Sequence, residues 1–323
     1  MLPNFLCIGA QKCGTTTLWH MLDAHPDICM ARPRETRFFS EDVRHAEGVP
    51  AYELRHFAHW RGERAVGEKC PEYLYLPHVP ERVLRALGGE LKFLICLRSP
   101  AQRAYAHYRH NIAQLREARP FADVLEDEVA TIRAGGFVAP PFGYIGRGDY
   151  AAQLERYFDL FGRERCYVIN FEEIVARQTA VAAGVFRFLE VEPRALPQHF
   201  HAGHASFGDM RLWVDNLQGA PRVHLLQGTS AVTSGGLRGL WRALSGHGAV
   251  PGAPVQVRAP SPELQAFAGN FAALRELPRR LSQDDELRIN QCYFSEAIER
   301  SAALLGTGFA RWLEAGEAWV DRP

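Results

Sequence analysis

A lysine near the start of the chain stands where it could bind a phosphate group. Lys12 lies between Gly9 and Gly14, in a segment that follows the apolar run 5–8 and precedes an amphipathic pattern over 15–22. A glycine-bracketed loop between a strand and a helix N-terminus directs backbone N–H groups and the positive end of the helix dipole at one point. Hydroxyl donors open the predicted helix at Thr15, Thr16 and Thr17. These residues predict an anion-binding loop.

The place of this lysine differs from its place in loops that bind nucleoside triphosphates. The triphosphate motif reads Gly, four residues, Gly, Lys and then Ser or Thr, and its lysine reaches the β- and γ-phosphates. Here Gly9 and Gly14 keep the spacing, but Thr15 holds the lysine's position and Lys12 lies in mid-loop. A cation in mid-loop favours a phosphate that bears a different transferable group. An ordinary strand-to-helix turn with an incidental lysine fits the pattern too.

Two further charged residues could take part in proton or group transfer. Glu35 stands among three arginines and just before Phe38 and Phe39. Nearby cationic and apolar groups could set its pKa for a general base, whereas composition alone favours a solvated loop. Lys69 precedes Pro71 and could face a reacting group, or it could be a surface lysine in a loop before a helix.

Positive side chains also follow the strongest strand pattern of the chain, at 91–97. Arg98 stands at the predicted carboxyl end of this strand, where open α/β sheets bind ligands. Its planar set of donors matches a phosphate bidentately. Arg103 and His110 lie on the helix predicted after Pro100. The histidine fits a polar helix face as well as a reaction centre.

An alternation of strands and helices must position these residues. Apolar runs predict strands over 5–8, 28–31, 91–97 and 166–171. Amphipathic patterns and stop signals predict helices over 15–22, 79–88, 119–134, 150–161 and 180–189, and helical segments within 263–304, one of them capped by Ser282. Loops are expected where Gly and Pro gather, at 135–141 and 219–262.

In combination, these segments resemble the sulfotransferases that use 3′-phosphoadenosine 5′-phosphosulfate (PAPS), especially the glycosaminoglycan-type enzymes. Residues 12–16 are similar to their 5′-phosphosulfate loop, and 35–39 to the segment where a glutamate before Phe-Phe serves as the base. Residues 68–73, Glu-Lys-Cys-Pro-Glu-Tyr, are similar to their Glu-Lys-Thr/Ser-Pro-x-Tyr segment, and Arg98 to their 3′-phosphate arginine. The segments occur in the family's order, and the resemblance runs from residue 3 to about 192.

The resemblance implies a P-loop-NTPase-like α/β fold with a parallel sheet of about four to five strands flanked by helices. It implies in-line transfer of a sulfuryl group from PAPS to a hydroxyl or amine of a carbohydrate or small-metabolite acceptor, without a required metal. The catalytic residues that it implies are Lys12, Glu35, Lys69 and His110. The cofactor-binding residues that it implies are Lys12, Cys13, Gly14, Thr15, Thr16, Thr17, Arg98 and Arg103.

Two departures from the family leave alternatives open. The family's helix serine falls at Ala106, so Ser99, Arg103 or a group from the C-terminal half would have to complete the 3′-phosphate site. The family's Lys- and Arg-rich cofactor loop is not recognisable near the C-terminal end. A kinase-like nucleotide enzyme on the same fold, or a noncatalytic protein that binds an adenosine bisphosphate, would fit such a site. The retained catalytic lysines and glutamate favour the sulfotransferase.

Length and composition fit a single domain over 1–323, with a cofactor-binding core at 1–192 and a variable part at 193–323. Lys plus Arg and Asp plus Glu number 37 each, so no overall field favours nucleic acid. Neither a signal peptide nor a run of about eighteen apolar residues is visible, so a cytoplasmic protein without a membrane span is expected.

The cysteines and a group of histidines raise the question of metal binding. Seven cysteines, an odd number without zinc-ligand spacing, are expected to be reduced and mostly buried thiols. The anion loop could activate the thiol of Cys13, although a space-filling role fits it better. His199, His201 and His204 lie close together, but no cysteine or carboxylate completes a familiar spacing, so no metal site is expected.

Overall fold

The chain forms two compact units. The computed structural model describes residues 1–114, 116–117, 119–196, 200, 210–217, 220–227, 277–278 and 280–314. The first unit comprises Met1–Ala104, Ile145–Gly203 and Ser282–Pro323, and the second comprises Tyr105–Tyr144 and His204–Leu281. The first unit holds a parallel sheet, and the second holds a helical segment and a β-hairpin.

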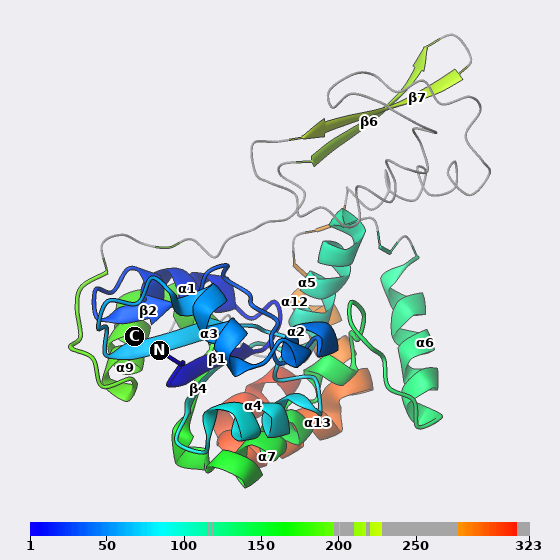
Figure 1. The fold of residues 1–323 in the computed structure, drawn as a ribbon. Helices are drawn as coiled ribbons and strands as arrows, with labels where there is room; N and C mark the ends of the chain where they lie inside the picture. Colours follow the sequence, from blue (N-terminus) through cyan, green and yellow to red (C-terminus); the bar gives the residue numbers. More distant parts are fainter. Residues whose placement is uncertain are drawn as a thin grey trace. The chain divides into compact units, whose positions relative to one another are not determined.

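The first unit is built on five parallel strands in the order β2-β3-β1-β4-β5. Figure 1 labels β1, β2 and β4 of this sheet. The strands are β1 (Phe5–Gly9), β2 (Ile28–Met30), β3 (Ala65–Lys69), β4 (Lys92–Leu97) and β5 (Cys166–Asn170). The predicted α/β fold with four to five parallel strands is confirmed. Four of the strands coincide with predicted apolar runs, because a strand covered on both faces must be apolar along its length.

The strand β3 has no counterpart among the sequence predictions. All its residues are buried, but its last two, Glu68 and Lys69, carry charged side chains. The apolar run is therefore too short to indicate a strand. Lys69 is 1% exposed, so the surface loop considered for it is wrong. Two residues before Lys69, Gly67 makes room for the ring of Phe5, which would lie 2.3 Å from a Cβ at that position.

The helices of the first unit connect and cover these strands. They are α1 (Thr15–Asp23), α2 (Asp42–Ala46), α3 (Val49–Phe57), α4 (Val79–Leu87), α7 (Tyr150–Phe161), α8 (Phe171–Ala176) and α9 (Gln178–Phe188). Four of them, α1, α4, α7 and α9, match the predicted helices closely. Helices α2 and α8, with five and six residues, are too short to produce a clear amphipathic pattern, and α3 was not predicted either.

Helices lie on both faces of the sheet. Phe93 of β4 packs against the ring of Tyr157 in α7, with centroids 5.2 Å apart. Tyr167 of β5 packs against Phe188 at the end of α9, also at 5.2 Å. The strand register pairs Tyr167 with Leu94, so Phe93 points to the opposite face. Helices α7 and α9 therefore cover opposite faces.

The end of the chain returns to the first unit as α12 (Gln283–Ile289), the π-helical turn η3 (Asn290–Phe294), α13 (Ser295–Leu305) and the 3₁₀ helix η4 (Thr307–Leu313). Ser282 caps α12 as predicted, because its hydroxyl accepts a hydrogen bond from the first turn. The buried Asn290 donates to Oγ of Ser99 at 3.1 Å and to the carbonyl of Trp312 at 2.8 Å. It also accepts from the backbone N of Ala101 at 3.0 Å. These bonds join the C-terminal helices to the segment after β4.

The helix α5 (Pro100–Ala113) begins in the first unit and ends in the second, which also contains α6 (Phe121–Arg133). The rings of Tyr105 and Tyr108 pack against Phe121, with centroids 5.3 and 4.9 Å apart. Residues 135–141 form a loop, as predicted. The carbonyl of Pro141 in this loop interacts with Nε2 of His107 at 2.9 Å. These contacts fix the loop to the second half of α5.

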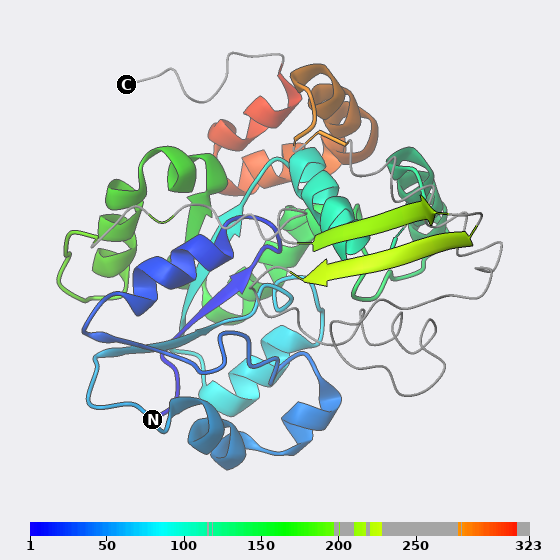
Figure 2. The ribbon, with the colours of Figure 1, turned by 90° about the horizontal axis from the view of Figure 1, so that it is seen from above.

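The second unit also contains an antiparallel hairpin of β6 (Met210–Leu217) and β7 (Ala220–Gln227), drawn as two opposed arrows in Figure 2. Because β7 lies within 219–262, the loop predicted over that stretch is wrong at 220–227. The glycines and prolines of 219–262 indicated a loop, although Val223 and Leu225 alternate with polar residues in the short pattern of a strand. The remainder of 219–262 lies outside the described residues.

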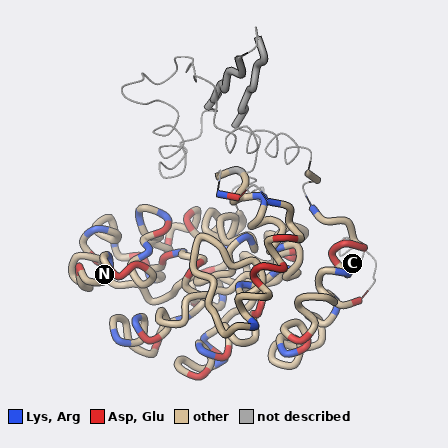
Figure 3. The backbone as a smooth tube through the Cα atoms, turned by 90° about the vertical axis from the view of Figure 1, so that its right-hand side faces the viewer, with Lys and Arg blue, Asp and Glu red and all other residues tan. Residues whose placement is uncertain are grey.

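Charges and thiols follow the expected pattern. Figure 3 shows Lys and Arg interspersed with Asp and Glu along the described chain. All seven cysteines are unbridged, and Cys292 is the exposed one. None of the described helices is both long and apolar enough to cross a bilayer.

Candidate active site

The predicted anion loop joins a central strand of the sheet, β1, to the N-terminus of α1. Gly14 has the left-handed φ of 85°, and a Cβ there would lie 2.9 Å from the ring of Phe171. A Cβ on Gly9 would lie 2.7 Å from the Cβ of Leu74. A side chain at either end of the loop would therefore clash with its neighbour, so both positions require glycine.

The start of α1 has the composition of an anion site. Its N-cap is Gly14, which has no side chain to occupy the first-turn N–H groups, and the first turn contains no acidic residue. Thr15 and Thr17 are buried, and Thr16 is partly exposed. A helix N-terminus of this kind favours a negative charge through its N–H groups and its dipole.

Three charged side chains from different elements meet beside the loop. Nζ of Lys69, at the end of β3, forms an ion pair with Oε1 of Glu35, from the connection between β2 and α2. Lys12, with a left-handed φ of 69°, interacts electrostatically with both. Burial and the Lys69 charge lower the pKa of Lys12 to about 8, and Glu35 opposes this shift. Lys12 is therefore mostly protonated at neutral pH.

Glu35 is ionised and reachable from solvent. Burial alone would raise the pKa of its carboxyl, but the charge and hydrogen bond of Lys69, with help from Arg37 and Arg34, lower it below the ordinary value. Its side chain is 32% exposed, whereas that of Lys69 is 2% exposed. The arrangement supplies a carboxylate that an incoming hydroxyl or amine could approach, with a cation behind it.

Cys13 is a space-filling residue of the loop rather than an activated thiol. Burial raises its pKa to about 11, although the nearby Arg103 charge opposes the shift. Its Sγ lies 3.7 Å from the hydroxyl of Tyr150, which in turn donates to the carbonyl of Arg98 at 2.9 Å. Tyr150 thus links the anion loop to the end of β4. Sequence reasoning placed this tyrosine at a helix entry but missed its part in the site.

Two arginines border the anion loop. The guanidinium of Arg98, just after β4, lies 4.6 Å from the ring centre of Phe171. The residue Arg98 as a whole is 8% exposed. The same ring lies against Gly14, so Arg98 is close to the start of α1. Arg103 on α5 is fully buried, and both guanidiniums act electrostatically on Cys13. Positive charge therefore surrounds the loop on the β4 side.

Most predicted site residues come together in the first unit. His110, with Ala106, lies on the part of α5 that belongs to the second unit, and its role stays a prediction. Among the described residues, no group of three or more His, Cys, Asp and Glu side chains is placed to hold a metal ion. His199, His201 and His204 lie outside the described residues.

A parallel α/β sheet with an anion loop after a central strand, and a lysine-glutamate-lysine group beside it, defines a class of phosphate-binding transferases. The chain belongs to the sulfotransferase-domain family, whose model matches residues 2–218. The resemblance inferred from the sequence motifs is therefore confirmed.

Two curated sulfotransferases are similar to part of this chain. Heparan sulfate glucosamine 3-O-sulfotransferase 5 of Mus musculus is 26% identical over 193 residues, covering 60% of this chain and 55% of that protein. Membrane-associated sulfotransferase kil1 of Dictyostelium discoideum is 31% identical, covering 61% of this chain and 60% of that protein. The chain thus spans little more than half the length of these curated relatives.

The fold of this chain is similar to that of a solved protein structure. The crystal structure of a sulfotransferase from Alicyclobacillus acidocaldarius matches with a TM-score of 0.54 and 35% sequence identity. The match covers 62% of this chain and 85% of that one. The sheet and its connections are therefore those of a sulfotransferase fold.

Proposed function

We propose that this protein transfers a sulfuryl group from PAPS to a hydroxyl or amine of a carbohydrate or small-metabolite acceptor. The observation that carries the proposal is the meeting of Lys12, Glu35 and Lys69 beside an anion loop. Membership of the sulfotransferase-domain family supports it. The names of the heparan sulfate relatives support a carbohydrate acceptor.

The residues around the loop fit a nucleotide with phosphates at two positions. Backbone N–H groups and hydroxyls at the start of α1, from Gly14 to Thr17, would hold the 5′-phosphate. Arg98 would hold the 3′-phosphate, because guanidinium groups pair well with phosphate oxygens, and the fully buried Arg103 would add its charge from beneath the surface. Ser99, which accepts a hydrogen bond from Asn290, anchors the backbone next to Arg98.

The proposed transfer step uses the charged groups beside the anion loop. Glu35 takes the proton of the acceptor as the acceptor oxygen or nitrogen forms its bond to sulfur. The bond between sulfur and the bridging phosphate oxygen breaks, and its electron pair stays on the phosphate of the leaving 3′-phosphoadenosine 5′-phosphate (PAP). Lys12 stabilises the charge that grows on that oxygen. The proton and charge both balance without a covalent enzyme intermediate.

The ion pair between Lys69 and Glu35 affects how strong a base Glu35 is. In the structure, Lys69 keeps Glu35 deprotonated, which a base requires but which also weakens it. Bound sulfuryl oxygens would offer Lys69 an alternative partner. If Lys69 turned to them, Glu35 would keep only the weaker influence of Arg37 and Arg34 and would become a stronger base.

Calorimetric titration with PAP tests the nucleotide site. Wild type is compared with Lys12→Ala and Arg98→Ala, each of which removes a charged phosphate contact. Each substitution is expected to weaken binding about tenfold or more. Lys92→Ala and Arg165→Ala are matched controls, because these residues pair with Glu190 and Glu90 at the surface. They should bind PAP as wild type does.

The same titrations separate the rival functions. Failure of wild type to bind PAP, together with binding and turnover of ATP and magnesium, would replace the proposal with a kinase-like activity. Tight PAP binding without sulfuryl transfer to any acceptor in a broad screen would indicate a noncatalytic binding protein.

A further inference from the structure

Two consecutive residues of one loop contact two consecutive residues of β3. Glu35 forms its ion pair with Lys69, and Oγ1 of Thr36 donates a hydrogen bond to Oε2 of Glu68. Successive side chains of a strand point to opposite faces. The loop is therefore attached to β3 on both sides, at a single register.

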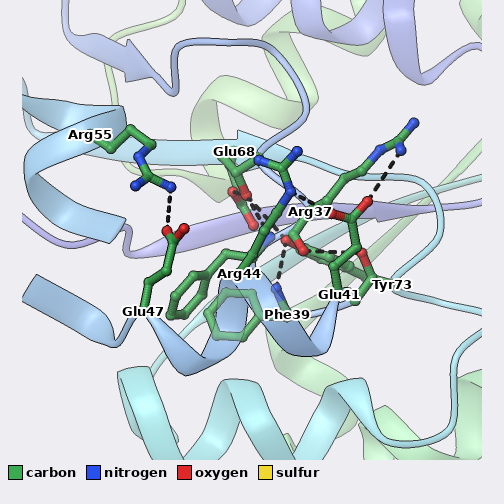
Figure 4. A network of polar contacts seen from close by, with 11 residues as sticks. Arg37, Phe39, Glu41, Arg44, Glu47, Arg55, Glu68 and Tyr73 are labelled. Atoms are coloured by element: carbon green, nitrogen blue, oxygen red, sulfur yellow. Dashed lines mark hydrogen bonds and ion pairs between the residues drawn. The ribbon is translucent and has the colours of Figure 1, made fainter. Parts of the chain in front are cut away.

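The Thr36 side of this attachment is enclosed. Thr36 and Glu68 are both 0% exposed. Oγ1 of Thr36 accepts from the backbone N of Phe38 at 3.1 Å and lies 3.2 Å from the hydroxyl of Tyr73. That hydroxyl accepts from the backbone N of Phe39 at 3.2 Å. Figure 4 shows Glu68, Tyr73 and Phe39 within this network.

The buried hydrogen bond between Thr36 and Glu68 fixes the geometry of this loop more strongly than the loop's ion pairs at the surface do. Arg37 pairs with Glu41, but their side chains are 48% and 40% exposed (Figure 4). Exposed ion pairs contribute little to a fixed geometry, whereas breaking a buried hydrogen bond leaves an unsatisfied polar group. The placement of Glu35 therefore depends chiefly on its neighbour Thr36 and on Glu68.

We propose that Thr36 and Glu68 are positioning residues, whose hydrogen bond holds the Glu35 carboxylate opposite Lys69. Neither residue touches the reacting atoms. Their importance for catalysis rests on the proposed function, in which Glu35 is the base. The contact that they maintain between Glu35 and Lys69 can be measured without any activity.

The test uses Thr36→Val, which removes the hydroxyl and keeps the shape, and Thr36→Ser, which restores the hydroxyl. The chain contains three lysines, Lys12, Lys69 and Lys92, so peptide mapping after trace acetylation reports each amine separately. Lys92 serves as the internal reference. The ion pair with Glu35 engages the Lys69 amine and shields it from the reagent, so acetylation of Lys69 relative to Lys92 should rise severalfold in Thr36→Val, where the carboxylate is no longer held against it. In Thr36→Ser it should match wild type.

Turnover and binding complete the test. In Thr36→Val, kcat should fall about tenfold while the Kd for PAP stays within about twofold, because the hydrogen bond positions the base and not the phosphates. Glu68→Gln keeps an acceptor oxygen at the same reach and should retain wild-type labelling of Lys69.

Two results would overturn the inference. One is wild-type Lys69 labelling in Thr36→Val. The other is loss of the folded state, by circular dichroism, in both Thr36→Val and Thr36→Ala, which would make Thr36 a purely structural residue. A wild-type protein without sulfotransferase activity would contradict the proposed function instead, and the labelling would still decide whether Thr36 holds Glu35.

Discussion

Among single residues, Lys12 changes its charge within the ordinary working range of pH. Its pKa is lowered to about 8 by burial and by Lys69, so the positive charge is present below that pH and lost as pH rises through it. The affinity for PAP should therefore fall above about pH 8, by at most about tenfold per pH unit.

The matched variant is Lys12→Arg, whose guanidinium stays protonated. Its affinity for PAP should stay level between about pH 7 and 9 in the same titrations, roughly one unit below and above the pKa of Lys12. The Cys13 thiol does not interfere, because its pKa is raised to about 11. An identical fall in both proteins would assign the titration to another group.

The residues expected to carry chemistry could be singled out in the sequence because their types and order are unusual. Lys12, Glu35, Lys69 and Arg98 were singled out in this way; the structure places them around the anion loop, and their roles stay predictions. Tyr150 and Glu68 were not singled out, since their partners, Cys13 and Thr36, are distant in sequence and a buried hydrogen bond leaves no periodic signal. Spacing along the chain indicates a loop, but only the folded sheet brings loops together.

Of the structural elements, the turn into α1 makes the sharpest stereochemical demand. Gly14→Ala should lower the free energy of unfolding by about 2–4 kcal/mol, because it adds left-handed strain and a clash with Phe171. It should also abolish PAP binding. The measurements are denaturant unfolding and calorimetry.

Gly135→Ala separates these two causes. Gly135 also has a positive φ, 77°, but nothing lies within 4 Å of a Cβ there. Its substitution should cost about 1–2 kcal/mol, the strain alone, with PAP binding unchanged. Equal costs at both positions would show that the ring of Phe171 moves aside.

Long elements with one clear period were predictable, and short or polar ones were not. The apolar run of β4 and the amphipathic pattern of α7 indicated their elements closely. The strand β3 was missed because charged residues occupy its end, which is also the end that meets Glu35. The charged side chains of Glu68 and Lys69 therefore removed the local signal of a strand.

For the molecule as a whole, the buried Glu68 links stability to pH. Burial raises its pKa to about 7, against hydrogen bonds from Thr36, Tyr73 and Tyr52 that lower it. As pH rises from 5 to 8, the unfolded chain loses this proton first. The free energy of unfolding should therefore decrease by roughly 2.5 kcal/mol over that interval.

Glu68→Gln has no proton to lose at this position. Between pH 5 and 8, wild type should therefore lose stability relative to Glu68→Gln. The loss should equal the decrease in unfolding free energy expected from the titration of Glu68. Glu81→Gln is the exposed control, and its difference from wild type should stay within about 0.5 kcal/mol. Parallel curves for Glu68→Gln and wild type would rule out this titration.

The distribution of thiols gives this protein a native attachment point for a reporter. Cys292 is exposed while the other six cysteines are buried, so a maleimide fluorophore should label one position without any substitution. That position lies two residues after Asn290, which is bonded to Ser99 beside Arg98. Emission from such a dye would follow, in real time, what happens at the end of β4 when a nucleotide arrives.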